Sequence, residues 1–297
     1  MIRIIINGKK AGLPEIRSII ATIREKGFPL EVRVTWEDGD GERFVREACT
    51  DGVPRLIAAG GDGTINEVVT GLAKLSLKKR PELAIMPLGT ANDFATACAI
   101  PAAPLAALRL AVTGSPEAID IVQANERYFV NVASGGFGAE VSADTPVQLK
   151  NFFGGGAYAL SAVIKSLSFR HNQGSLIAKD VELKGAALIA AVCNGRQAGG
   201  GQILAANAYI NDGLLDVFLI LSFPLTNINQ VLQEVLNVSE NGQYVKRFQT
   251  PWLLATPEAT RSVNLDGEPY QADTIRFEVV PKAIQLILPD DCPCILK

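Results

Sequence analysis

The segment between Gly60 and Glu67 combines glycines with small polar residues directly after an apolar run. It reads Gly-Gly-Asp-Gly-Thr-Ile-Asn-Glu and follows a predicted strand, Arg55–Ala59. Glycine permits a tight turn and a close approach of backbone N–H groups to an anion. We expect a helix to begin here, and the positive end of its dipole favours a phosphate. Thr64 adds a hydroxyl that can cap the helix.

Two familiar phosphate-binding loops do not fit this segment. The dinucleotide fingerprint requires a third glycine at the position of Asn66, and the Walker A loop requires a lysine after its glycines. Neither requirement is met. A strand-to-helix turn that happens to contain several glycines therefore stays open as the simpler interpretation.

A second polar loop, Pro87–Ala95, also lies between a predicted strand and a predicted helix. It contains Thr90, Asn92 and Asp93, three residue types that cap helices well. Capping needs only one of them. Because neighbouring parallel strands end at the same edge of a sheet, the two loops could hold one triphosphate from both sides.

Composition limits the classes of partner. The chain has 297 residues, 28 Lys and Arg against 31 Asp and Glu, and a net charge of −3, so we expect no nucleic-acid partner. The longest apolar run, Ala186–Cys193, is far shorter than the roughly 20 residues of a membrane-spanning helix. We expect a cytoplasmic protein without a transmembrane segment that meets any lipid at the membrane surface.

Cysteine and histidine offer little obvious chemistry. The five cysteines are scattered, and His171 is the single histidine, so the sequence predicts neither a disulfide framework nor a zinc site. The close pair Cys292 and Cys294 is interpreted as two reduced thiols. His171 lies in a polar stretch and is interpreted as a surface residue.

The elements that would position the two loops alternate between strand and helix in the first part of the chain. Repeated units of this kind predict a doubly wound parallel sheet with helices on both faces. The expected strands are Ile2–Ile6, Glu31–Trp36, Arg55–Ala59 and Leu83–Met86, and the expected helices are Pro14–Lys26, Gly41–Thr50, Ile65–Lys74, Ala91–Ala97 and Leu105–Val112.

The second part of the chain is mainly strand-like and predicts an antiparallel β-sandwich. We place the boundary between residues 1–122 and 123–297, and expect the last few residues to pack back on the first domain. The expected strands are Ala118–Ala124, Arg127–Ala133, Val181–Leu183, Ala187–Val192, Leu214–Leu221, Arg261–Leu265, Ile275–Val280 and Ile284–Leu288, and the expected helices are Phe152–Leu167 and Thr226–Asn237.

The two loops together resemble the diacylglycerol kinase catalytic family, which includes sphingosine kinases and bacterial lipid kinases. The first loop is shared with NAD kinases, whereas the second separates lipid kinases from them. Asn194–Gly201, Asn211–Leu215 and Asn264–Pro269 also resemble the family, so the likeness spans essentially the whole chain. The YegS-type bacterial lipid kinases are the most similar branch.

The resemblance implies a phosphofructokinase-like N-terminal domain, a β-sandwich C-terminal domain, and ATP bound between them. It also implies Mg²⁺, and it assigns a metal site in which Ca²⁺ is an alternative. The implied nucleotide contacts are Thr35, Gly61, Asp62, Gly63, Thr64, Ile65, Asn66, Glu67 and Thr90. The implied metal ligands are the carboxylate of Asp212 and the main-chain carbonyls of Tyr209 and Leu214, an all-oxygen set.

A proton acceptor is implied after the Asp-Gly turn in the second domain. Glu268 matches the family's base, which would accept the proton of the attacking lipid hydroxyl. Asp266 is interpreted as a turn residue, because Asp-Gly is a common hairpin signal. Asp62 and Asp93 are candidates to orient a magnesium ion that arrives with ATP.

Three further segments have two interpretations each. Asn194–Gly201 is either a loop near the lipid headgroup or a solvated hairpin. Lys78–Arg80 is interpreted as a solvated helix end rather than a membrane contact. Core packing is favoured over lipid contact for a set of aromatic residues near the glycine-rich loops, namely Phe137, Phe152, Phe153 and Tyr158.

The sequence therefore predicts an ATP-dependent lipid kinase whose acceptor is a glycerolipid hydroxyl, on phosphatidylglycerol or diacylglycerol. An NAD kinase-like enzyme is the enzymatic alternative, and Pro87–Ala95 speaks against it. A non-catalytic nucleotide-binding regulator is the alternative from another class. The intact Asp62, Asn92, Asp93 and Glu268 argue against it.

Overall fold

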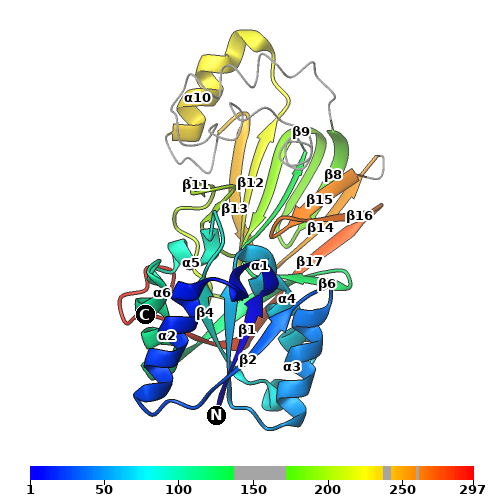
Figure 1. Cartoon of the computed structure of the whole chain (residues 1–297). Coiled ribbons are helices and arrows are strands. Elements are labelled where there is room, and N and C mark those ends of the chain that lie inside the picture. Colours follow the sequence, from blue (N-terminus) through cyan, green and yellow to red (C-terminus); the bar gives the residue numbers. More distant parts are fainter. Residues whose placement is uncertain (137–171, 237–241, 259–260) are drawn as a thin grey trace.

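The computed structural model describes residues 1–136, 172–236, 242–258 and 261–297. Figure 1 shows a helix-covered part that contains the N-terminus and, above it, a part built mainly from strands. The predicted combination of an α/β domain with a mainly antiparallel β-sandwich is confirmed. No helix among these residues combines the length and the apolar character that crossing a membrane requires.

The N-terminal part contains a parallel sheet in the order β2-β1-β3-β4. Its strands are β1 (Ile2–Asn7), β2 (Leu30–Thr35), β3 (Arg55–Gly60) and β4 (Glu82–Pro87). The helices are α1 (Gly8–Ala11), α2 (Pro14–Glu25), α3 (Asp40–Thr50), α4 (Asp62–Ala73), α5 (Asp93–Ala97) and α6 (Pro104–Thr113), with a 3₁₀ turn η1 (Leu77–Lys79).

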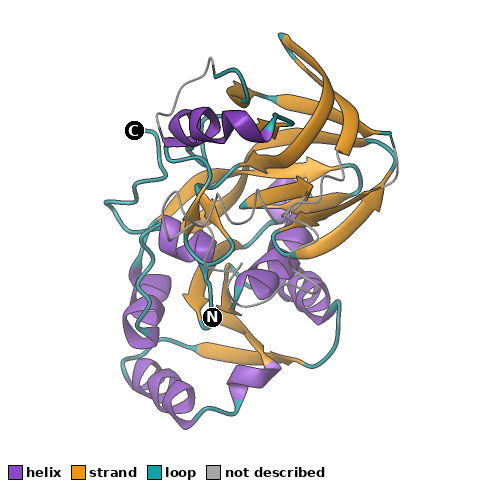
Figure 2. Ribbon diagram, turned by 90° about the horizontal axis from the view of Figure 1, so that it is seen from above, coloured by secondary structure: helices purple, strands orange, loops and turns teal. Residues whose placement is uncertain are grey.

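The strands of this sheet bury both faces, which explains their continuous apolar runs. Alternate residues face opposite sides, so Ile5 packs under α3, α4 and α5, whereas Ile4 and Ile6 pack under α2 and α6. Both cores are closed to solvent. Figures 1 and 2 show the helices on either side of the sheet.

The C-terminal part is a mainly antiparallel assembly in which β12 and β13 pair beside β9. Its strands are β5 (Pro116–Ala124), β6 (Arg127–Phe129), β7 (Val132–Gly136), β8 (Asn172–Ala178), β9 (Val181–Cys193), β10 (Gln197–Ala198), β11 (Gln202–Ile203), β12 (Leu215–Leu221), β13 (Val245–Thr250), β14 (Trp252–Pro257), β15 (Arg261–Leu265), β16 (Glu268–Ala272) and β17 (Ile275–Ile287). A 3₁₀ turn η2 (Leu225–Asn227) leads into α10 (Ile228–Leu236).

Two predicted pairs of strands are wrong because each pair forms one long strand. The strands expected at Ile275–Val280 and Ile284–Leu288 form the single strand β17, which ends at Ile287 and whose pairing with β5 shifts register at a bulge between the two segments. Val181–Leu183 and Ala187–Val192 are both part of β9. A bulge or a glycine interrupts the side-chain pattern along a strand without ending the backbone pairing.

Two strands join the halves of the molecule. β17 pairs with β14 in the sandwich and reaches β4 through Leu286 and Leu83, while β5 runs antiparallel to β17. The predicted boundary at residues 122 and 123 lies within β5. Beyond β17, Cys292 and Cys294 are buried in the core that contains α3, α4 and α5. The helix expected at Phe152–Leu167, together with His171, lies outside the described residues.

Candidate active site

The carboxyl ends of four parallel strands bring the predicted nucleotide-binding residues together. Thr35 ends β2 and lies opposite Asn7 at the end of β1. The Asn7 side chain donates from Nδ2 to Thr64 Oγ1 over 3.4 Å, which links β1 to the first glycine loop. The second loop lies against the first, because a Cβ built on Gly89 would be only 2.5 Å from Gly61 Cα. The two loops expected to hold one triphosphate are therefore adjacent.

The residues of the first loop differ in how they face solvent. Gly61 is the N-cap of α4, and Asp62 and Gly63 form its first turn, where N–H groups without a partner inside the helix and the helix dipole favour an anion. Ile65 is 1% exposed and packs in the core, and its N–H donates to the Gly61 carbonyl. Its side chain therefore stabilises the helix instead of facing the site. In the second loop, Thr90 is exposed.

The side chains of Asn66 and Glu67 each form hydrogen bonds to a neighbouring segment of the chain. Asn66 Nδ2 donates to the Tyr128 carbonyl and to Asp266 Oδ2, both over 3.1 Å. Glu67 Oε2 accepts a hydrogen bond from the Gly41 N–H over 3.0 Å, at the start of α3. Burial raises the pKa of Glu67. The nucleotide contacts of these two side chains stay predictions. In the structure, Asn66 binds the segments at Tyr128 and Asp266, and Glu67 binds the start of α3.

Two aspartates tie the loops to each other and to the sandwich. Asp62 accepts from the Asp93 and Phe94 N–H groups over 3.3 and 3.4 Å and so caps α5. Burial raises the pKa of Asp62, and the nearby charge of Asp93 adds to the effect. Asp93 in turn accepts from the Gly200 and Gly201 N–H groups over 2.9 and 2.6 Å. Its carboxylate thus holds the Asn194–Gly201 loop beside α5.

Glu268 lies across from the first glycine loop although it belongs to the other half of the chain. It begins β16 and is exposed, and a Cβ built on Gly63 would be 3.4 Å from Glu268 Oε1. The predicted base therefore faces the first turn of α4. This juxtaposition brings a carboxylate to the place where the helix favours a phosphate.

One part of the site was missed by the sequence reasoning. The segment Asn7–Lys10, which ends β1 and begins α1, contributes Asn7 to the contact with Thr64 and carries two lysines. Lys9 is exposed, and its N–H donates to Asn7 Oδ1 over 3.0 Å. The signal was available, because Asn-Gly after an apolar strand follows the same strand-to-helix logic as the other loops.

The predicted metal ligands lie around a partly buried turn. Asp212 Oδ1 accepts from the Leu214 N–H over 3.0 Å, and the neighbouring Asp120 accepts from the Gly213 N–H over 2.7 Å. Burial raises the pKa of Asp212, and the charge of Asp120 adds to the effect. Arg196 lies over the Tyr209 ring, 5.3 Å from its centroid. The described residues contain no group of three or more His, Cys, Asp or Glu that could hold a metal ion.

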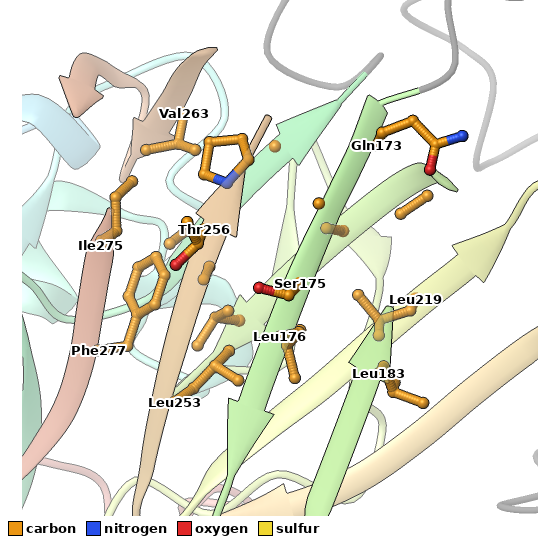
Figure 3. Close-up of a pocket in the computed structure, with 18 of the residues that line it drawn as sticks. Gln173, Ser175, Leu176, Leu183, Leu219, Leu253, Thr256, Val263, Ile275 and Phe277 are labelled. Carbon is orange, nitrogen blue, oxygen red and sulfur yellow. The ribbon is translucent and has the colours of Figure 1, made fainter. Parts of the chain in front are cut away.

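An apolar pocket of about 190 Å³ lies inside the sandwich (Figure 3). It is formed by β7, β8, β9, β12, β14, β15 and β17. Leu176, Leu219, Leu253 and Phe277 supply its apolar walls, and Val263 of β15 lines it close to the turn that leads to β16. The aromatic residues considered for lipid contact, Phe137, Phe152, Phe153 and Tyr158, lie outside the described residues.

Comparison with known proteins agrees with this geometry. Residues 1–124 match the diacylglycerol kinase catalytic domain, and residues 131–288 match the YegS C-terminal NAD kinase beta sandwich-like domain. A Shewanella frigidimarina protein named "Probable lipid kinase YegS-like" is 46% identical over 100% of this chain and 96% of its own length. A protein of the same name from Chromohalobacter salexigens is 44% identical over 97% of this chain and 93% of its own length.

Solved structures show the same fold. A Bacillus anthracis structure of the diacylglycerol kinase type has a TM-score of 0.82 at 25% identity and covers 98% of this chain and 96% of its own. A second structure from that organism, described as a diacylglycerol kinase, has a TM-score of 0.76 at 23% identity, covering 98% of this chain and 97% of its own. The fold and the paired loops define a phosphotransferase with an alcohol group as acceptor. The chain belongs to the diacylglycerol kinase family and is a lipid kinase of the YegS type.

Proposed function

We propose that this lipid kinase transfers the γ-phosphoryl group of ATP to a hydroxyl of a glycerolipid headgroup, with phosphatidylglycerol as the acceptor. The observation that supports this most directly is the position of Glu268. Its Oε1 lies 3.4 Å from where a Cβ of Gly63 would be, at the start of α4. A base on one domain thus faces a phosphate-binding helix end on the other.

In this proposal the ATP phosphates lie against the first turn of α4. The N–H groups of Asp62 and Gly63 and the hydroxyl groups of Thr35 and Thr90 are the proposed neutral donors. Lys9 supplies positive charge from the start of α1. The absence of side chains on facing glycines lets the backbone approach the phosphates closely.

Glu268 is the proposed proton acceptor. The lipid hydroxyl lies between Glu268 and the γ-phosphate. Its proton passes to the carboxylate as the oxygen attacks phosphorus, and the bond between the γ-phosphorus and the β,γ-bridging oxygen breaks, so that ADP leaves. Phosphoryl transfer depends mainly on positioning and on neutralising charge at the phosphate oxygens. Asp62 is the side chain proposed to orient a magnesium ion that arrives with ATP. Such an ion would neutralise the phosphate oxygens.

A second cation fits the Asp212 turn. The carboxylate of Asp120 is buried and that of Asp212 is partly buried, and they lie close enough for the charge of Asp120 to raise the pKa of Asp212. An oxygen-coordinated ion such as Mg²⁺ or Ca²⁺ would relieve that repulsion. Asp212 and the carbonyls of Tyr209 and Leu214 are the proposed ligands. This ion would stabilise the turn before β12 and takes no part in the chemistry.

The pocket inside the sandwich is the proposed site for the acyl part of the lipid. Its walls are apolar, and β15, which contributes Val263, pairs with β16 through Leu265 and Glu268. An acyl chain in the pocket therefore leads toward the base. The proposed location is the cytoplasm, with peripheral binding at the inner face of the membrane.

Transfer of label from [γ-³²P]ATP tests the proposal. The acceptors are phosphatidylglycerol, diacylglycerol, sphingosine and NAD, each in mixed micelles with and without Mg²⁺. Glu268→Gln should lose at least about 100-fold in turnover while ATP binding by calorimetry is retained. Glu25→Gln, at the exposed end of α2 and far from the strand carboxyl ends, is the matched control.

Each result of the labelling experiment distinguishes one of the alternative functions from the others. Label on phosphatidylglycerol that disappears in Glu268→Gln supports both the acceptor and the base. Label on diacylglycerol alone corrects the acceptor, and label on NAD overturns the lipid assignment of this site. ATP binding without transfer to any acceptor indicates a nucleotide-binding regulator.

A further inference from the structure

The Asp266 carboxylate receives four hydrogen bonds. Oδ1 accepts from the N–H groups of Asn131 and Val132, both over 3.0 Å. Oδ2 accepts from the Val130 N–H over 2.9 Å and from Asn66 Nδ2 over 3.1 Å. A carboxylate has about four acceptor sites, so these donors use its capacity. Asp266 is therefore more than the turn residue that the Asp-Gly signal predicts.

The four donors come from both halves of the molecule. Three are successive backbone N–H groups of residues 130–132, which lead into β7. The fourth, Asn66, lies on α4 one turn after Gly63. β15 also pairs with β7 through Leu265 and Ala133. The carboxylate consequently joins the β15–β16 turn to β7 and to the helix that forms the phosphate loop.

The same turn carries Glu268. Asp266 and Gly267 have positive φ angles of 52° and 97°, so the chain reverses within two residues and delivers Glu268 to the start of β16. Glu268 Oε1 and Asp266 Oδ2 both face α4, the first near Gly63 and the second at Asn66. The hydrogen bond between Asp266 and Asn66 therefore fixes the distance between Glu268 and the first turn of α4 at Gly63.

We propose that Asp266 is a positioning residue, whose bond to Asn66 sets the distance between the Glu268 base and the phosphate-binding end of α4. Asp266 does not accept the substrate proton or bind magnesium, because its oxygens are occupied by N–H donors. This inference rests on the proposed function of Glu268. A displacement of about 1 Å at a reacting group can cost about 100-fold in rate.

Kinetics of Asp266→Asn test this role. The amide has the shape of the carboxylate but turns an NH₂ group toward N–H donors, so at least two of the four bonds are lost. We expect kcat per folded molecule to fall about 10- to 100-fold, whereas the KM and Kd for ATP change less than about threefold. Asp180→Asn, at the exposed β8–β9 turn, is the matched control and should match the wild type.

Asn66→Ala provides an independent variant, because it removes the side-chain donor to Asp266, together with the bond to the Tyr128 carbonyl, and keeps the three backbone bonds to Asp266. It decides the question if Asp266→Asn does not fold. Residues 130–132 should exchange their amide hydrogens faster in Asp266→Asn but not in Asn66→Ala. The double variant should be no slower than the slower single variant, since both changes remove one shared interaction.

Two results would overturn the inference. One is a kcat that stays normal in the folded single variants while thermal stability falls, which assigns Asp266 a structural role alone. The other is a double variant whose loss equals the product of the single losses. Glu268→Gln is measured in parallel: if it stays active, the proposed base is wrong, whereas an inactive Glu268→Gln with a normal Asp266→Asn refutes only the positioning role.

Discussion

The contact between the two glycine loops gives a sharp prediction for Gly89→Ala. A Cβ on Gly89 would lie 2.5 Å from Gly61 Cα and 2.7 Å from Asn92 Oδ1. Ordinary contact begins at 3.4 Å, so the loops must separate by about 0.9 Å. Both neighbours are constrained, because Gly61 is backbone and Asn92 Oδ1 accepts from the Gly89 N–H over 2.8 Å.

A separation of this size should act on catalysis more than on folding. We expect kcat/KM to fall about 100-fold, and overpacking should lower the free energy of unfolding by about 1–3 kcal/mol. Phosphate transfer to phosphatidylglycerol micelles and denaturant titration measure the two effects.

Gly12→Ala is the matched control for this change. Its φ of −77° suits alanine, and a Cβ there meets no atom within 4 Å. We expect normal activity and a gain in stability of up to about 1 kcal/mol. Normal turnover in Gly89→Ala would refute the reasoning that the two loops must touch to hold one nucleotide.

Three further changes should have measurable effects. Burial raises the pKa of Asp216 to about 6, so ionisation of this carboxyl destabilises the folded protein as pH rises. In urea titrations, Asp216→Asn should therefore add on the order of 1–2 kcal/mol to the free energy of unfolding at pH 8, and nothing below about pH 4. Arg80→Ala removes donors to the carbonyls of Ala73, Leu75 and Ala283, so the free energy of unfolding should fall by at least about 2 kcal/mol; an unchanged melting temperature would contradict this. Ala190→Phe fills the sandwich pocket and should lower kcat/KM for the lipid at least about tenfold, while calorimetry finds unchanged ATP binding.

Arg80 also shows where a local interpretation falls short. Lys78–Arg80 reads as a solvated basic cluster, and Lys78 and Lys79 are exposed. Arg80 instead donates to the Ala283 carbonyl over 2.6 Å and so fixes β17 to the end of α4. The partner is 203 residues away in the sequence, and no local pattern contains that information.

The sequence by itself determined the fold class, the family and the two glycine loops. These follow from short-range chemistry: continuous apolar runs predict buried parallel strands, and glycines after a strand predict a helix end open to phosphate. The bounds of two strands do not follow from these patterns, because a bulge in β17 and Gly185 in β9 interrupt the side-chain pattern without ending the backbone pairing.

Only the tertiary structure decided which side chains share the site. Ile65 packs in the core. Asn66 donates a hydrogen bond to Asp266, and Asp93 accepts hydrogen bonds from the backbone N–H groups of Gly200 and Gly201. Each of these hydrogen bonds joins residues more than 100 positions apart. Its energy depends on burial and geometry that appear only when α4 meets the β15–β16 turn and α5 meets the turn between β10 and β11. The sequence supplied the candidate groups, and the packing of the two domains set the distances between them.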